Sequence, residues 1–174
     1  MKFFKLKKKQ LLKSFQKELK AYQQLERNIS TEKIESIAVL IENEQSFQRD
    51  VVGDLSRQFH ISKENITCFV FKEFEKKEIL SSEFISQNDF GWSGSLNLNS
   101  LSEFVKNDYD LLINYGFEDN LYLKVITLRS RSKFKIGFNS SDEGLYDLAV
   151  SDTERAIETL NLETDKYLKI LKKI

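Results

Sequence analysis

Residues 36–41 (SIAVLI) and residues 66–71 (ITCFVF) decide the fold class of this chain of 174 residues. Each is a short, continuous apolar run, which is typical of a strand that a parallel sheet buries on both faces. Between them, apolar residues recur every four positions from Phe47 to Phe59, and this spacing predicts a helix over 45–59. A strand, a helix and a second strand in this order form a βαβ unit, whose crossover is right-handed in nearly all proteins.

The rest of the chain continues this alternation. Apolar runs predict strands at 109–114, 134–138 and 145–150, and periodic patterns predict helices at 100–106 and 119–130. The segment from Ser151 to Glu154 has the pattern of a capping box, so we expect helices at 152–160 and 164–173. The expected fold is α/β, a three-layer Rossmann-like sandwich around a mostly parallel five-stranded sheet, with an added basic N-terminal helix. The residues expected in its core include Ile37, Val39, Ile41, Val70, Leu112 and Ile136.

Charge is divided unevenly along the chain, although its formal net charge is zero. Residues 1–20 contain eight lysines and one acid, Glu18, so they carry +7 and the remaining residues carry −7. Over 9–27, apolar residues from Leu11 to Leu25 recur at three- and four-residue steps and gather on one side of a helix, opposite the lysines. We therefore divide the chain into a basic amphipathic helix at 1–30 and a single α/β domain at 31–174.

Three roles compete for this basic helix. Its apolar side could dock on the sheet while the lysines face water, it could bind phosphate backbones, or it could lie on anionic lipid with Phe3, Phe4 and Leu6 inserted. Because the apolar stripe continues to Leu25, we expect the second half to pack on the domain and the first nine residues to be free for a partner. The partner-binding residues predicted here are Lys2, Lys5, Lys7, Lys8, Lys9, Lys13 and Lys17.

The patterns of common enzymes and cofactor-binding proteins are missing from the sequence. There is no glycine-rich dinucleotide fingerprint and no phosphate loop. One cysteine, Cys68, and one histidine, His60, cannot build a structural zinc site. His60 follows a predicted helix, where a structural role is favoured over catalysis. We expect no catalytic residue, no metal and no cofactor, and we favour a non-enzymatic protein.

The same features bear on the compartment. Cys68 lies within an apolar run, and a free buried thiol suits a reducing environment. The basic start lacks the apolar region of a secretory signal, and no stretch approaches the ~20 apolar residues that span a bilayer. We expect a cytoplasmic protein.

Polar residues follow the predicted strands at the edge where open α/β sheets bind ligands. Glu118 and Asp119 could act as an acid–base or magnesium pair, although we favour helix capping by Asp119 and Ser151. The single tryptophan lies between two glycines and could be a recognition aromatic or could close one end of the sheet. The possible ligand crevice comprises Asn114, Glu118, Asp119, Asn120 and Trp92.

A second basic cluster precedes and enters the strand at 134–138. Its residues alternate along the chain, so they could share one side of the turn into that strand, although such charges are usually only solvated. We include them as further candidates for partner binding: Arg129, Arg131, Lys133 and Lys135.

Several short segments together resemble an uncharacterised family of small proteins from Bacteroidota. They are residues 110–114 (DLLIN), 118–120 (EDN), 132–137 (SKFKIG), 146–148 (YDL) and 167–171 (YLKIL). Residues 89–94 (DFGWSG) resemble that family's Asp-aromatic-Trp-Phe-Gly pattern, with Ser93 where an aromatic residue is expected. Residues 109–138 are also similar to the first domain of heptosyltransferase-type glycosyltransferases, which implies a Rossmann-like sheet. The chain has no room for the second, nucleotide-sugar-binding domain of those enzymes.

These observations favour an accessory or adaptor protein that contacts a larger anionic assembly, first of all the ribosome or RNA, through its basic N-terminal helix. Such a role implies participation in a protein complex and no readout of DNA sequence. A small enzyme or ligand-binding domain that uses the crevice is the alternative, and a peripheral protein of the membrane surface is the third candidate.

Overall fold

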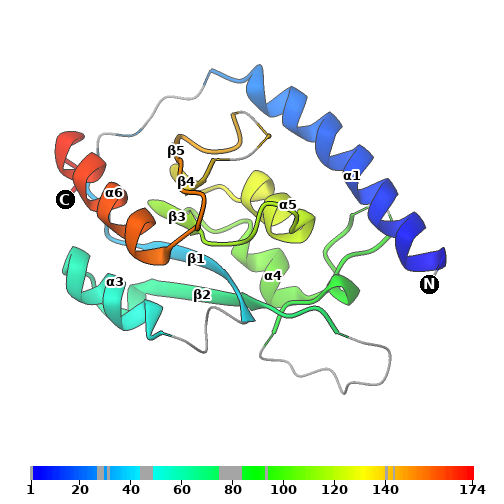
Figure 1. Ribbon diagram of the computed structural model, residues 1–174, viewed down its shortest axis with the longest axis horizontal. Helices are drawn as coiled ribbons and strands as arrows, with labels where there is room; N and C mark the ends of the chain where they lie inside the picture. The colour runs from blue at the N-terminus through cyan, green and yellow to red at the C-terminus, as the bar shows by residue number, and fades with distance from the viewer. Residues whose placement is uncertain are drawn as a thin grey trace.

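The computed structural model describes residues 2–26, 30, 32–43, 49–74, 84–92, 94–139, 141–142 and 144–174. These described residues form a five-stranded sheet, parallel throughout, with helices on both faces (Figure 1). The predicted Rossmann-like sandwich is therefore confirmed. Its strands are β1 (Ile37–Glu42), β2 (Ile66–Phe71), β3 (Leu111–Asn114), β4 (Phe134–Phe138) and β5 (Leu148–Val150).

The strand order is β2-β1-β3-β4-β5, the order of flavodoxin-like doubly wound sheets. The chain moves outward from β1 to β2 and then returns to the other side of β1 to build β3, β4 and β5. The direction of winding therefore changes between β1 and β3. Ligands of doubly wound sheets bind at the carboxyl edge beside such a switch point.

Strand β1 shows why the sheet is buried on both faces. Its Ile37, Val39 and Ile41 belong to the core under one layer of helices, whereas Ala38 and Leu40 belong to the core under the other. All five are fully buried. Of the six residues predicted for the core, five are buried, and Val70 on the outer strand β2 is partly buried.

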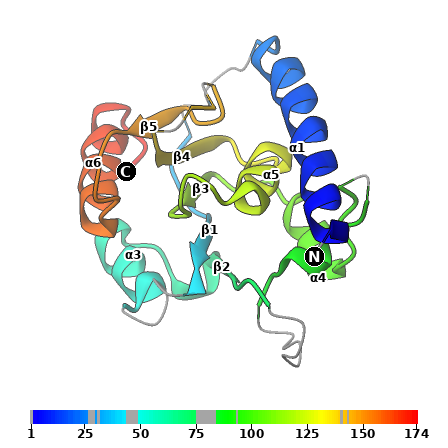
Figure 2. The same ribbon diagram turned by 45° about the vertical axis from the view of Figure 1, so that its right-hand side comes forward.

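The helices divide between the two faces of the sheet. Figure 2 shows α3 (Val51–Phe59) and α6 (Ile157–Ile170) on one face, and α4 (Asn99–Phe104) and α5 (Leu121–Arg129) on the other. The helix α1 (Lys2–Gln23) lies outside α5 and forms an additional outer element (Figures 1 and 2). Two short 3₁₀ turns complete the described elements, η1 (Lys63–Asn65) and η2 (Gln87–Asp89).

Helix α5 explains why α1 docks there. Every residue from Leu121 to Leu128 is buried, including a lysine and a threonine. A helix that is apolar on all sides needs cover on the side that faces away from the sheet. Leu11, Phe15 and Leu19 of α1 supply this cover.

The N-terminal helix differs from its prediction in its bounds and in the width of its buried apolar stripe. It begins at Lys2, so the first residues are turns of α1 and not a separate free arm. It ends at Gln23, before Leu25, which is exposed. Leu12 is exposed as well, because the buried stripe follows the four-residue steps from Leu11 to Leu19 and leaves neighbouring positions outside.

The C-terminal region holds one helix where two were predicted. Residues 151–156 do not start a helix, because Arg155 has a left-handed backbone (φ 51°) and Asp152 accepts hydrogen bonds from the backbone N–H groups of Glu154 and Ala156. The expected capping box is therefore wrong. The expected break near Asn161 is also wrong, because this buried residue accepts a hydrogen bond from the Tyr115 hydroxyl within a continuous α6.

Candidate functional site

The loop from Tyr115 to Asn120 lies at the carboxyl edge beside the switch point, and a buried carboxylate holds it. Glu42 at the end of β1 accepts hydrogen bonds from the Phe117 N–H (3.2 Å) and the Asn120 amide (2.7 Å). Asn120 in turn accepts from the Leu123 N–H (3.1 Å) and caps α5. Asn120, and not Asp119 as predicted, is therefore the capping residue. Ser151 caps no helix either, since Ala156 occupies that position in α6 without a side-chain bond.

Asn114, a predicted crevice residue, supports the structure from inside. It is buried, donates to the Thr127 and Tyr146 hydroxyls (3.0 Å each) and accepts from the Gly116 N–H (2.8 Å). Burial raises the pKa of Tyr146, so its hydroxyl stays protonated. The Tyr146 ring lies against Gly137, where a Cβ atom would come within 2.4 Å of ring carbons. Asn114 is therefore part of a buried network between β3, β4 and α5.

Glu118 and Asp119 are exposed at the same edge. Glu118 pairs with Arg155 (3.5 Å) and accepts from the Ser141 N–H (3.3 Å). Within the described residues, no group of three His, Cys, Asp or Glu side chains is arranged to hold a metal ion. The two carboxylates remain exposed acids at the rim of a surface hollow.

This hollow lies where α1 passes the start of α5, and its volume is about 500 Å³. Basic side chains of α1 line it together with residues of the predicted crevice. The basic helix and the crevice are separate sites in the sequence-based prediction, and the structure brings them together. Its lining is Lys5, Lys8, Lys9, Leu12, Phe15, Gln16, Glu118, Asp119, Leu121, Lys124, Ser141 and Asp142.

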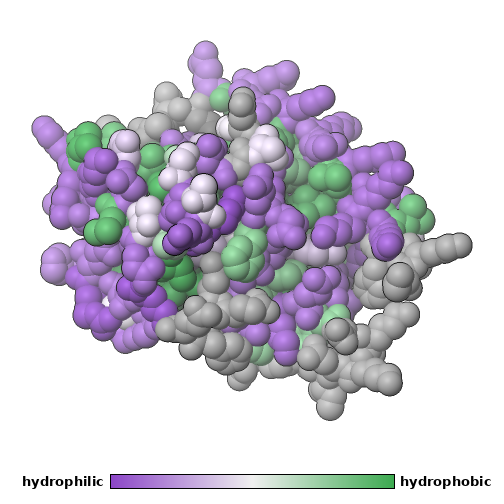
Figure 3. Space-filling view, in the orientation of Figure 1, coloured by the Kyte–Doolittle hydropathy of each residue, from purple (hydrophilic) through white to green (hydrophobic). Residues whose placement is uncertain are grey.

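Four further lysines of α1, all among the residues whose side chains the structure describes, divide between two surroundings. Lys13, Lys17 and Lys20 are exposed on the outer side of the helix, where the surface is largely hydrophilic (Figure 3). Lys7 points toward the protein and donates to the Gln87 backbone oxygen (3.5 Å). Partial burial lowers the pKa of Lys7, against the opposing effect of Asp89. Lys7 is thus a contact between α1 and η2.

The second basic cluster is not a free cationic surface, contrary to prediction. Arg129 donates to both oxygens of Glu18 (2.8 and 2.7 Å) and to the Gly94 backbone oxygen. These hydrogen bonds lower the pKa of Glu18 and tie α1 to the end of α5. Lys135 is buried, with its ammonium group 4.7 Å from the centre of the Tyr22 ring. Of the four residues, only Arg131 is exposed.

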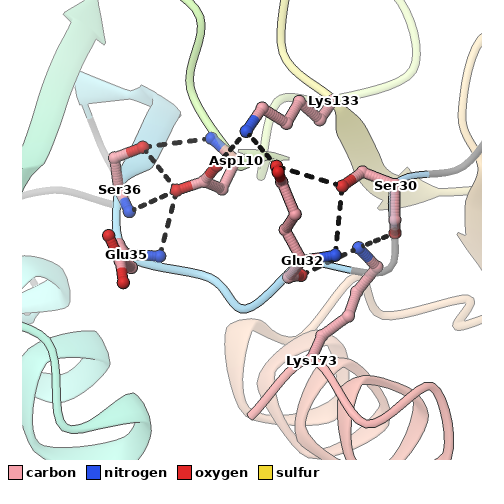
Figure 4. Close-up of polar contacts among 7 residues, drawn as sticks. All are labelled: Ser30, Glu32, Glu35, Ser36, Asp110, Lys133 and Lys173. Carbon is pink, nitrogen blue, oxygen red and sulfur yellow. Dashed lines mark hydrogen bonds and ion pairs between the residues drawn. The ribbon is translucent and has the colours of Figure 1, made fainter.

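Lys133, the remaining member of the cluster, belongs to a polar network at the opposite, amino-terminal edge of the sheet (Figure 4). Its ammonium group contacts Asp110 (2.9 Å) and Glu32 (2.7 Å). Figure 4 also shows Asp110 bound to Ser36 and Glu35, and Lys173 bound to backbone oxygens of Ser30 and Glu32. The network fixes the segment before β1 against β3, β4 and the C-terminus, so Lys133 has a structural role.

Trp92 does not join the crevice. It is 43% exposed in a segment whose Gly94 lies against Arg129 at the far end of α5. The crevice residues precede the start of this nine-residue helix, which is about 13 Å long at ~1.5 Å per residue. The segment that holds Trp92 and the crevice therefore lie at opposite ends of α5.

His60 and Cys68 take the structural roles expected of them. His60 ends α3 in a left-handed backbone conformation (φ 56°), with its N–H bonded to the Ser56 oxygen. Cys68 packs against the core on the α3 and α6 side, and burial raises its pKa to about 11.

Together these features define a doubly wound, Rossmann-like α/β domain with a lysine-rich helix docked beside its carboxyl edge. The chain belongs to a family of unknown function, DUF6913, whose model matches residues 7–171. No curated protein and no solved structure shows a significant match to the chain. Among the described helices, none is long and apolar enough to cross a membrane. The bacterial group and the glycosyltransferase likeness stay predictions.

Proposed function

We propose that the protein is a non-enzymatic accessory protein that binds RNA in a larger assembly, first of all the ribosome, through the exposed lysine face of α1. The observation that carries this proposal is a row of cations on a helix that the core holds in place. We call this row the lysine ridge, and it consists of Lys5, Lys9, Lys13, Lys17 and Lys20.

The spacing of the lysine ridge suits an extended polyanion. From Lys5 to Lys17 its members recur every four residues, and they share one side of the helix. At ~1.5 Å per residue, successive charges are about 6 Å apart along the axis, and the ridge extends for about 22 Å. Leu11, Phe15 and Leu19 fix the opposite side of α1 in the core. The charges are therefore presented in a fixed row.

The same charges work against the stability of α1. Lysines four residues apart repel one another, at a cost of about 0.2–0.5 kcal/mol per pair. The first turn of α1 has no acidic residue to favour the helix dipole. Within the described part of the chain, the ridge lysines form no ion pair that would relieve this repulsion. A phosphate backbone would relieve it, because it neutralises the lysines and releases counterions.

Co-sedimentation with purified ribosomes tests the proposal. The ridge variant carries Lys13→Gln, Lys17→Gln and Lys20→Gln, which remove three charges and spare the buried side of α1. The control variant carries Lys33→Gln, Lys63→Gln and Lys106→Gln, three exposed lysines elsewhere. Substitution is preferable to deletion of residues 1–9, because those residues form the first turns of α1.

We expect the unaltered protein and the control variant to sediment with ribosomes at low salt, and the ridge variant to stay in the supernatant. Equal sedimentation of all three proteins would contradict the proposal, as would the absence of sedimentation of any of them. Anionic vesicles form a parallel arm. Ridge-dependent binding to vesicles without binding to ribosomes would replace RNA with a membrane surface as the partner.

A further inference from the structure

Two adjoining hollows lie at the carboxyl edge of the sheet. The larger, of about 500 Å³, lies between the first half of α1 and the start of α5. The smaller, of about 290 Å³, lies beside the switch point and includes Glu42 at the end of β1. Lys8 and Asp119 line both hollows, so the two meet at these residues. Their sizes together are in the range of small-molecule sites, and the edge is where such sheets bind ligands.

The charges in the larger hollow leave an excess of cations. Lys124 is paired with Asp142 (2.6 Å), and Glu118 is paired with Arg155 (3.5 Å). Lys5, Lys8 and Lys9 then face one remaining acid, Asp119, and within the described residues none of these three lysines forms an ion pair. Within the larger hollow the unbalanced charge is +2, from three lysines against one aspartate, and the smaller hollow adds the carboxylates of Glu42 and Glu73 on the side away from Lys5 and Lys9. A phosphate monoester carries a matching charge of about −2 near neutral pH.

The lining of the smaller hollow differs from that of the larger one because it contains several aromatic side chains. Three aromatic residues line it, and two of them, Phe71 and Tyr122, are buried and stacked with ring centroids 5.3 Å apart. The third, Phe117, is 43% exposed although its backbone N–H is held by the buried Glu42 carboxylate. An exposed aromatic ring on a fixed loop is suited to stacking against a flat, unsaturated ring.

We propose that the two hollows form one binding site for a nucleoside monophosphate, with the phosphate among Lys5, Lys8 and Lys9 and the base against Phe117. Lys8 lies at the junction, between the phosphate and the ring. The site is distinct from the outer part of the lysine ridge, because Lys13, Lys17 and Lys20 do not line either hollow. A free nucleotide and the terminal nucleotide of an RNA chain present the same chemistry.

Isothermal titration calorimetry on the full chain tests this site. The probes are the four nucleoside 5′-monophosphates, the corresponding nucleosides, inorganic phosphate and a 5′-phosphorylated dinucleotide. The site variants are Lys5→Gln with Lys8→Gln, and Phe117→Ala, all at positions exposed enough to leave the core intact. The ridge variant with Lys13→Gln, Lys17→Gln and Lys20→Gln, which removes three charges outside both hollows, is the control for a loss of positive charge on α1.

We expect at least one nucleotide to bind about tenfold or more tightly than its nucleoside and than inorganic phosphate. Each site variant should weaken that binding by about tenfold, and the ridge variant should leave it within about twofold. Tighter binding of the dinucleotide would identify an RNA end as the source, and weaker binding would identify a free nucleotide. No nucleotide binding at millimolar concentration, equal binding of phosphate or nucleoside, or unchanged binding by the site variants would overturn the proposal.

The outcome of this calorimetric test can be distinguished from the outcome of the test of RNA binding. The outer ridge lysines are changed in one experiment, and the lysines of the hollow are changed in the other. Ribosome binding that depends on Lys13, Lys17 and Lys20 can therefore succeed or fail independently of nucleotide binding that depends on Lys5, Lys8 and Phe117.

Discussion

At the residue scale, Asp110 shows how one carboxylate joins distant segments. It accepts hydrogen bonds from the N–H groups of Glu35 and Ser36 (3.0 Å each) and from the Ser36 hydroxyl (2.9 Å), and it pairs with Lys133 (2.9 Å). Burial alone would raise the pKa of Asp110, but these contacts outweigh burial and lower it. The charged form is therefore the one that stabilises the fold.

The change Asp110→Asn should lower the free energy of unfolding by about 1–3 kcal/mol near neutral pH, because it leaves the donors of Glu35, Ser36 and Lys133 with a weaker, uncharged acceptor. The pKa of Asp110 is lower in the folded protein, so its contribution is complete above the unfolded value of about 3.9 and is lost as pH falls through the folded value. Urea unfolding from about pH 7 to 3 should show a constant difference down to about pH 5 and a shrinking one below about pH 4. The control is Asp108→Asn, an exposed carboxylate nearby. An equal loss in both variants would show that Asp110 has no special role.

At the element scale, the docking of α1 on α5 is the contact on which the proposed function depends. Phe15 is 1% exposed in this contact, whereas Leu12, on the same helix, is 42% exposed. The change Phe15→Ala should lower the free energy of unfolding by about 3–5 kcal/mol, and Leu12→Ala should lower it by less than about 1 kcal/mol. Urea unfolding measures both values. Similar small losses in the two variants would mean that α1 is not held by the core in solution, and the lysine ridge would lose its fixed spacing.

The elements themselves follow from the sequence to different degrees. The strands β1, β2 and β4 were predictable because continuous apolar runs are buried on both faces of a parallel sheet. β5 begins at Leu148 and is shorter than predicted. The apolar residues Leu145 and Tyr146, which suggested an earlier start, pack into the core and against Gly137 from the loop before the strand. The single α6 was missed because a left-handed Arg155 and a buried Asn161 leave no periodic signal in the sequence.

At the scale of the whole molecule, the candidate site joins segments more than a hundred residues apart in the chain, which periodicity cannot pair. Lys5, Lys8 and Lys9 meet Asp119 and Lys124 only because α1 covers α5. One signal for this contact exists in the sequence, since residues 121–128 are apolar on nearly every side and such a helix needs a cover. The pairing of Arg129 with Glu18 and of Lys133 with Asp110 had no such signal. The basic cluster at 129–135 was therefore misinterpreted.

The separation of charge is the property of the whole molecule that the proposed function explains. Residues 1–20 carry +7 and the rest of the chain carries −7, so the body repels polyanions while α1 attracts them. Binding of RNA should accordingly be confined to α1 and should depend steeply on salt, because each neutralised phosphate releases a counterion.

The salt dependence of RNA affinity tests this central claim most directly. Fluorescence anisotropy with a labelled ribosomal RNA hairpin should give a slope of log affinity against log salt near −4 for the unaltered protein, which corresponds to about four to five phosphates at ~0.9 per contact. The variant with Lys13→Gln, Lys17→Gln and Lys20→Gln should give a slope shallower by about 2.7, at ~0.9 per contact. The control with Lys33→Gln, Lys63→Gln and Lys106→Gln should keep the slope near −4. The same slope in the ridge variant and the unaltered protein would contradict the account, because the lysines of α1 would then not be the groups that meet the phosphates.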